Sequence, residues 1–183
     1  MAECRRIRHG EAVIDEGERI AALLGLERLP HEGGKFRRTH IDAHCSAIYY
    51  LLVAPEFSAL HALASTEIYH WHAGAPLRLL LLHQDGGLTE PVLGPDLAAG
   101  ERPQVVVPAG TWQGSSPDGG WSLVSTTTAP PFRWQDFHLG DRATLLDTYP
   151  AAHTRIESLT RPPPPVANPV GSVVRSVDGD GWG

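Results

Sequence analysis

The sequence is poor in cysteine, in long apolar runs and in positive charge, and each shortage narrows the possible classes of protein. Its two cysteines, Cys4 and Cys45, lie far apart and belong to no C-x-x-C pair. They therefore indicate neither a disulfide framework nor a zinc ribbon. We expect a protein of the reducing cytoplasm.

No stretch reaches the roughly 18 consecutive apolar residues that a membrane span needs. The basic N-terminus is followed by Gly10 and acidic residues instead of an apolar core, which argues against a signal peptide. The formal net charge of -6 leaves no basic footprint for a phosphate backbone. We therefore predict no membrane and no nucleic acid as a partner, and a small-molecule ligand instead.

What remains is a globular composition, with 42% hydrophobic and 20% charged residues, in a chain of 183 residues that suits one domain. We predict an N-terminal extension over residues 1–9 and a single domain over residues 10–158. Residues 159–183 contain four consecutive prolines and many glycines, which cannot form a packed core. We expect them to be a flexible tail, and assign it no function.

Hydrophobic periodicity predicts a domain built mainly of strands. Helical spacing indicates one helix within residues 11–28, and Asp141 is placed to cap a short helix that ends before Pro150. A polar loop is expected over residues 115–120. Between the helices we expect about eight to ten short strands, within residues 35–40, 46–53, 57–61, 67–72, 77–82, 88–93, 104–107, 121–128 and 132–137. Such spacing is typical of a sandwich or barrel.

The stretch from residue 60 to residue 82 contains most of the reactive side chains. Because successive side chains of a strand point to opposite sides, one face of strand 67–72 should present a carboxylate, a phenol and an indole, from Glu67, Tyr69 and Trp71. The opposite face should present Ile68, His70 and His72. Gly74 and Pro76 end this strand, and the apolar run 77–82 follows, so we predict a hairpin.

Two motifs, one in this stretch and one further along the chain, resemble those of the cupins. The first cupin motif has two histidines, a glutamate and a glycine, whose places fall at His61, Leu63, Glu67 and Gly74. The second has the form Pro-x-Gly-x-x-His and is similar to residues 108–113, Pro-Ala-Gly-Thr-Trp-Gln. Leu63 and Gln113 thus stand where the second and the last histidine ligand would be.

Further motifs, over about residues 23–150, look like the branch called cupin-5; they lie at residues 32–34, 36–37, 48–52, 67–74, 93–96, 106–110 and 129–130. The chain departs from this branch at Lys35, Tyr69 and Pro131. The resemblance implies an all-β, double-stranded β-helix (a jelly-roll or cupin barrel), with an N-terminal helix, a short C-terminal helix and a ligand pocket at the barrel mouth. It also implies a fold similar to that of sugar-nucleotide epimerase cupins, and a homodimer. We expect the strand region Phe36 to His40 to contribute to the dimer contact, because a jelly roll must cover its edge strands.

The residues favour metal-independent acid/base chemistry, of the isomerase, epimerase or lyase type, on a small polar metabolite or natural-product intermediate. In an apolar barrel Glu67 is desolvated and suits a general base, with His61 as its acid partner and Tyr69 as a phenolic donor. Candidate substrate-binding residues are Arg37 for an anionic group, aromatic side chains for stacking, and neighbouring polar groups: Tyr49, Trp71, His72, Trp112 and Gln113.

Two alternatives stay open. The first is a metal-dependent cupin enzyme such as a dioxygenase, with a divalent metal held by His61, Glu67 and Gln113. Because Leu63 and Gln113 remove two of four expected ligands, we predict no stoichiometric metal; His70 and His72 would face the barrel only if a bulge turned one inward. The second is a non-catalytic binding cupin, in which aromatics fill the barrel and Glu67 is satisfied by Arg37 or by backbone groups.

Overall fold

The computed structural model describes residues 9–162, with side chains from residue 15 onward. Its helices are α1 (His9–Leu24), α2 (Arg142–Thr148) and α3 (His153–Ser158), with 3-10 turns η1 (Trp134–Asp136) and η2 (Pro150–Ala152). Its strands are β1 (Glu27–Arg28), β2 (Lys35–Ile41), β3 (Ser46–Val53), β4 (Ser58–Leu63), β5 (Thr66–Gly74), β6 (Leu77–Leu82), β7 (Leu88–Thr89), β8 (Val92–Leu93), β9 (Gln104–Val107), β10 (Trp112–Pro117), β11 (Trp121–Ala129) and β12 (Phe137–Leu139). Nearly all of the predicted N-terminal extension, and the predicted tail from residue 163 on, lie outside the described residues.

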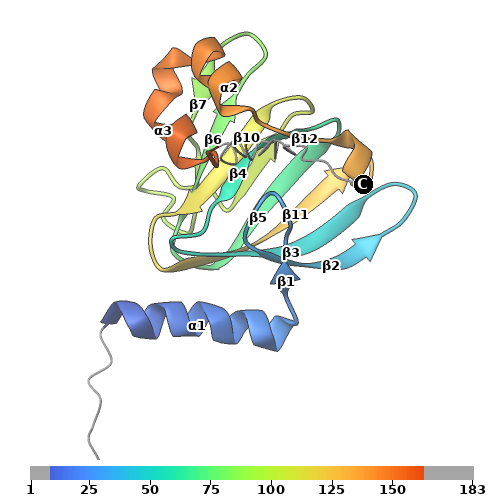
Figure 1. The fold of residues 1–183 in the computed structure, drawn as a ribbon. Coiled ribbons are helices and arrows are strands. Elements are labelled where there is room, and N and C mark those ends of the chain that lie inside the picture. Colours follow the sequence, from blue (N-terminus) through green and yellow to red (C-terminus); the bar gives the residue numbers. More distant parts are fainter. Residues whose placement is uncertain (1–8, 163–183) are drawn as a thin grey trace, which may run out of the picture.

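The strands form two sheets that face each other (Figure 1). The first sheet has the order β1-β2-β3-β11-β5-β9, and the second has the order β12-β4-β10-β6-β7, with β8 also paired to β6. All of these pairs are antiparallel. The predicted all-β jelly roll is confirmed, as are the N-terminal helix and a short C-terminal helix; α3 is a second one that was not predicted.

The predicted hairpin of strands 67–72 and 77–82 is wrong. β5 pairs with β11 and β9 in the first sheet, whereas β6 pairs with β10, β7 and β8 in the second. The connecting residues hydrogen-bond to the β10–β11 turn, through Ala75 N–H to Trp121 O (2.7 Å) and Asp118 N–H to Pro76 O (2.8 Å). The short connection therefore carries the chain from one sheet to the other, which gives the apolar β6 burial on both faces.

Two other strand predictions also need correction. The first half of the expected polar loop over residues 115–120 is strand, because β10 continues to Pro117 between β4 and β6, and residues 118–120 form the turn to β11. Ser115 is only 1% exposed there. The expected edge strand over residues 132–137 is instead the turn η1 followed by β12. The polar residues at 115–120 had predicted a loop, and the aromatic residues at 132–137 had predicted a strand.

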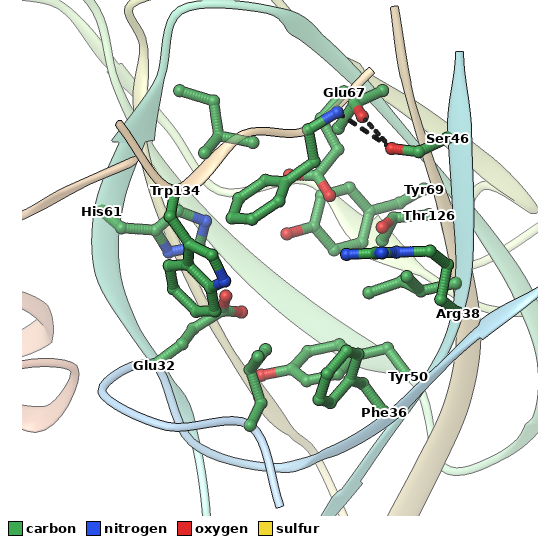
Figure 2. Close-up of a pocket in the computed structure, with 15 residues that line it drawn as sticks. Glu32, Phe36, Arg38, Ser46, Tyr50, His61, Glu67, Tyr69, Thr126 and Trp134 are labelled. Atoms are coloured by element: carbon green, nitrogen blue, oxygen red, sulfur yellow. Dashed lines mark hydrogen bonds between the residues drawn. The ribbon is translucent and has the colours of Figure 1, made fainter. Parts of the chain in front are cut away.

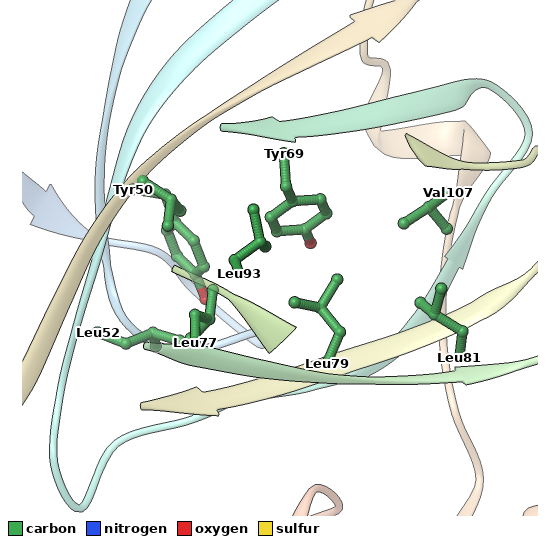
Figure 3. Close-up of a cluster of buried hydrophobic side chains, with 9 residues drawn as sticks. Tyr50, Leu52, Tyr69, Leu77, Leu79, Leu81, Leu93 and Val107 are labelled. Atoms are coloured by element: carbon green, nitrogen blue, oxygen red, sulfur yellow. The ribbon is translucent and has the colours of Figure 1, made fainter. Parts of the chain in front are cut away.

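The main core lies between the two sheets (Figure 3). Inward-facing side chains of both sheets meet there: Tyr50, Leu52, Tyr69, Leu77, Leu79, Leu81, Leu93, Val107 and Val124. Each is almost fully withdrawn from water. This apolar cluster fills the deep part of the barrel.

The helices cover the outer faces of the barrel (Figure 1). Leu145 of α2 and Ile156 of α3 pack on Leu60, Leu80 and Leu82 of the second sheet, while α1 packs on the first. The predicted cap of α2 is confirmed, because the Asp141 side chain accepts a hydrogen bond from Thr144 N–H at 2.9 Å. None of the described helices combines the length and hydropathy of a membrane span.

The folded part of the chain extends slightly beyond the domain limit expected from sequence. Leu159 and Thr160, which were assigned to the tail, are buried, and Leu159 belongs to the cluster beneath α2 and α3. Arg161 donates hydrogen bonds to the backbone carbonyl of Glu32 and lies 5.0 Å from the centre of the Phe57 ring. The chain is thus held to the barrel as far as Arg161.

Candidate functional site

A cavity of about 70 Å³ opens at the mouth of the barrel. Its wall is built by β2, β3, β5 and β11 of the first sheet, by β4 of the second, and by residues 132–134 (Figure 2). A water molecule needs about 10–15 Å³ of such space, so the cavity holds a few waters or one small ligand group. The lining combines apolar side chains with charged, imidazole and hydroxyl groups.

Glu67 lies on the cavity wall and is 6% exposed. One carboxylate oxygen, Oε2, accepts a 2.6 Å hydrogen bond from Nε2 of Gln113. Burial raises the pKa of the Glu67 carboxyl above its ordinary value, and this is only partly offset by the nearby His61 and by the Thr126 and Gln113 side chains. An ionised Glu67 is therefore a stronger base than a carboxylate in water.

His61 lies on β4 and lines the same cavity. Its Nδ1 is 2.8 Å from the carbonyl oxygen of Ala59, and its ring stacks on Phe137 with centroids 5.1 Å apart. Because a carbonyl oxygen can only accept, the proton of the neutral ring is assigned to Nδ1. Nε2 is then the atom available to a ligand, and the ring cannot turn without losing both contacts.

Two buried tyrosines, Tyr69 and Tyr50, line the same cavity as Glu67 (Figure 2). Burial raises the pKa of Tyr69 well above its ordinary value, and the neighbouring Glu67 raises it further. Burial likewise raises the pKa of Tyr50, whose hydroxyl donates to the Gly33 carbonyl at 2.9 Å. Both phenols therefore remain protonated and act as hydrogen-bond donors, not as bases.

The mouth of the cavity contains both signs of charge (Figure 2). Arg38 of β2 points its guanidinium toward the opening, and no hydrogen bond or ion pair joins it to another described residue. Glu32 lies on the wall, with Oε1 accepting a 2.7 Å hydrogen bond from Ser58 Oγ. Phe132 and Trp134 form an aromatic rim. Arg38 is thus the cation that an entering anionic group would meet.

β5 does contain a bulge, but it does not turn a histidine inward. Trp71 and Ala73 pair with adjacent residues of β11, which leaves His72 as the extra residue. His72 is exposed and lies 2.9 Å from Ser125 Oγ. Burial, and the nearby His70, lower its pKa. The prediction that His72 binds substrate in the barrel is therefore wrong in its geometry.

The five other predicted binding residues also lie outside the cavity lining. Arg37 donates to the Leu24 carbonyl at 3.0 Å, on the helix side of β2. Tyr49 is 37% exposed and faces His72 on the outer surface. Trp112 packs beneath α2 and α3, and Trp71 packs on the core and donates to Ala75 O. Gln113 is buried inside the barrel and reaches the site only through Glu67.

Several residues that line the cavity were not found from the sequence: Glu32, Arg38, Ser46, Tyr50, Thr126 and Trp134. Alternation was the signal for Arg38, because it shares a strand face with the aromatic Phe36. Arg37 and Arg38 are adjacent, so they face opposite sides of β2, and the sequence alone does not show which of the two faces the barrel. The register of β2 also shifts after Arg38, which breaks the alternation there. Glu32 comes from a turn, and no strand pattern places it.

The donor set of the barrel does not fit a transition-metal ion. Such a site wants three or four imidazole, carboxylate or thiolate ligands. Only His61 and Glu67 are available at the expected motif positions, because Leu63 is apolar and Gln113 turns its amide nitrogen toward Glu67. No three His, Cys, Asp or Glu residues of the described part of the chain come together inside the barrel. We therefore derive no step through a metal.

The fold and the site place the chain in the cupin class: an antiparallel two-sheet barrel with an internal glutamate and histidine. The sequence model described as Cupin superfamily (DUF985) matches residues 18–140. The chain belongs to this family. No match was found among curated proteins.

Solved structures agree with this assignment. A protein from Shewanella oneidensis is 36% identical with a TM-score of 0.75, over 80% of this chain and 98% of that one. A hypothetical protein from Leishmania major is 28% identical with a TM-score of 0.74, over 79% and 98% of the two chains. Oxalate decarboxylase from Bacillus subtilis, at 11% identity and a TM-score of 0.52, over 73% of this chain and 37% of that one, shares the fold alone.

Proposed function

We propose that the protein is a cytoplasmic enzyme that moves a proton on a small anionic metabolite without a metal, as an isomerase, epimerase or lyase does. The observation that carries this proposal is that Glu67 of the first sheet and His61 of the second line the same cavity, each held by a fixed hydrogen bond. The free thiol of Cys45 agrees with a reducing compartment.

Glu67 is the proposed general base. Burial raises the pKa of its carboxyl, which brings the group closer to neutral pH, where a base is both ionised and effective. Gln113 holds Oε2, so the other oxygen, Oε1, is the atom that takes the proton from carbon. The carbanion or enolate that results needs a donor, and the protonated phenol of Tyr69 lines the same cavity, whereas the Tyr50 hydroxyl already donates to the Gly33 carbonyl.

His61 is the proposed partner of Glu67. With Nδ1–H held by the Ala59 carbonyl, Nε2 exchanges protons with the ligand. In an epimerisation, the imidazolium form returns a proton to the opposite face of the carbon; in an elimination, it protonates the leaving group. Both outcomes conserve atoms and charge, since Glu67 takes one proton from the substrate carbon and His61 gives one proton to the substrate.

Cavity size and charge limit the ligand. The open space of about 70 Å³ admits a reacting group of a few heavy atoms, with the remainder of the molecule at the aromatic rim. Arg38 has no described partner of its own, and a guanidinium matches a carboxylate or phosphate with two parallel hydrogen bonds. We therefore propose a small carboxylic acid, sugar acid or sugar phosphate as the substrate class.

Solvent exchange tests the proposal directly. The protein is incubated in D2O with a panel of carboxylic acids, sugar acids and sugar phosphates, and mass spectrometry detects deuterium at carbon. We expect one chemical class to take up deuterium and then to convert. A compound that binds tightly but neither exchanges nor converts would identify a binding cupin and overturn the enzymatic proposal.

The Arg38 guanidinium should control ligand affinity. We expect Arg38→Gln to weaken binding of the anionic ligand by roughly 10- to 100-fold, because a charge-assisted hydrogen bond contributes about 1.5–3 kcal/mol. Calorimetric titration with the compound from the exchange panel measures the change. Arg37→Gln is the matched control, since it removes the same charge from the opposite face of β2. Equal losses in both variants would contradict a specific role of Arg38.

We also propose a homodimer in which β2 takes part. β1 pairs with β2 only at Lys35 and Phe36. The outer edge of β2 from Arg37 onward therefore has no partner among the described strands. An uncovered edge is a template for pairing with a second copy. Light scattering should give twice the mass of one chain, and a monomer at micromolar concentration would contradict the proposal.

A further inference from the structure

The turn between β2 and β3 brings three metal-binding side chains together outside the barrel. His40 lies near the end of β2, and Asp42 and Cys45 lie in the turn that follows it. One donor atom from each of these residues lies within 4.8 Å of the others. Within the described residues no other three His, Cys, Asp or Glu side chains meet in this way.

The spacing of these atoms suits a tetrahedral ion. Nε2 of His40 lies 3.3 Å from Oδ2 of Asp42. In a tetrahedral zinc site with bonds of about 2.0–2.3 Å, neighbouring ligand atoms are about 3.3–3.8 Å apart. His40 and Asp42 are therefore already at the separation that shared coordination requires, and a donor atom of Cys45 lies within 4.8 Å of both.

Asp42 is held in place by its own turn. Its Oδ1 accepts hydrogen bonds from the backbone N–H groups of His44 (2.8 Å) and Cys45 (2.9 Å). These bonds orient the carboxylate, with Oδ2 left to face His40. Backbone donors behind a carboxylate ligand are the outer-shell support that metal sites use.

We propose that His40, Asp42 and Cys45 bind one zinc ion, with the fourth position open to water. One imidazole nitrogen, one carboxylate oxygen and one thiolate sulfur form a borderline-soft donor set that zinc accepts. Magnesium and calcium prefer oxygen ligands throughout, so they do not match it. In the single chain the His40 and Asp42 side chains are 53% and 46% exposed, so an ion can reach them there.

The zinc site and the cavity share two strands but no ligand atom. Arg38 of β2 and Ser46 of β3 line the cavity, within two residues of His40 and Cys45. A bound ion would join both sides of the turn and hold these strands in register at the cavity mouth. The site itself does not rest on the proposed enzymatic function.

Titration of the full chain with zinc chloride tests the site. The protein is free of any affinity tag and kept reduced, and calorimetry measures the stoichiometry and affinity. We expect one zinc ion per chain, with affinity that falls at lower pH because His40 and Cys45 must be deprotonated. Loss of an outer-shell partner already lowers metal affinity by roughly tenfold or more. His40→Ala and Cys45→Ser each remove a direct ligand, so each should lower zinc affinity by at least that factor.

Cobalt identifies the ligands. A cobalt-loaded protein should show a thiolate-to-cobalt absorption band that disappears in Cys45→Ser and remains in Cys4→Ser, the control at the other cysteine. His70→Ala is the control for binding by an unrelated histidine. The proposal is overturned if wild-type protein binds no zinc at micromolar concentration, or if the His40 and Cys45 variants bind as well as the controls. His40→Ala alters only an exposed side chain, so it decides the matter if Cys45→Ser does not fold.

Discussion

Glu67→Gln should lower turnover by roughly two to four powers of ten while the protein stays folded. Loss of a general base has an effect of this size, and the amide is nearly isosteric with the carboxyl and still accepts a hydrogen bond from Gln113. The rate is the deuterium uptake of the substrate found in the exchange panel. Melting temperature is measured on the same preparation. A variant that is fully folded and fully active would eliminate Glu67 as the base and leave His61.

The same variant should also change how stability depends on pH. Burial raises the folded-state pKa of Glu67 above its ordinary value of 4.5, so the folded protein binds a proton that the unfolded chain has lost over the interval between the two values. Stability contributed by Glu67 is thus highest at low pH and falls as pH rises through that interval. Glu67→Gln has no proton to lose and should lack this fall.

Urea unfolding at several pH values between about pH 4 and pH 8 measures this difference. The free energy of unfolding of Glu67→Gln, relative to wild type, should increase with pH. Glu27→Gln on the exposed strand β1 is the matched control, because its carboxyl is not buried. If wild type and Glu67→Gln show the same pH profile, Glu67 is not the desolvated carboxyl that the proposed function requires.

The central site residues could be predicted because their strand has two different faces. Glu67 and Tyr69 alternate with half-buried neighbours, and the motif spacing places His61 on the strand before them. β3 offers no such contrast, since both of its faces contain apolar side chains, and the exposed Tyr49 was preferred to the buried Tyr50. Alternation identifies the inner face only where the opposite face is polar.

Long-range contacts determined what the sequence could not show. Glu32 reaches the cavity from a turn because Ala59 N–H bonds to its carbonyl at 2.9 Å, a contact across 27 residues of chain. Trp134 reaches the rim through η1, at a position where its aromatic neighbours predicted a strand. The pairing of β5 and β6 also failed for this reason. Their short connection is typical of a hairpin, and only the position of β10 and β11 sends the two strands into different sheets.

Gly74→Ala should cost about 2–5 kcal/mol of folding free energy. Gly74 has φ of 90°, and a Cβ built there would lie closer than 3.0 Å to the Trp121 carbonyl oxygen and indole ring. A left-handed conformation costs an L-residue about 1–2 kcal/mol, and overpacking adds about 1–3 kcal/mol. The backbone oxygen cannot move aside, because it accepts the 2.7 Å hydrogen bond from Ala75 N–H where the chain changes sheets. The melting temperature should fall by roughly 5–20 °C.

Gly86→Ala separates the two causes of that loss. Gly86 has nearly the same φ, 86°, but nothing lies within 4 Å of a Cβ built there. The alanine of Gly86→Ala therefore has only the conformational cost of about 1–2 kcal/mol. We expect urea unfolding to show a clearly larger loss for Gly74→Ala, or soluble protein from Gly86→Ala alone. Equal losses would mean that Trp121 yields to a methyl group, and that the crossing between the sheets does not require glycine at position 74.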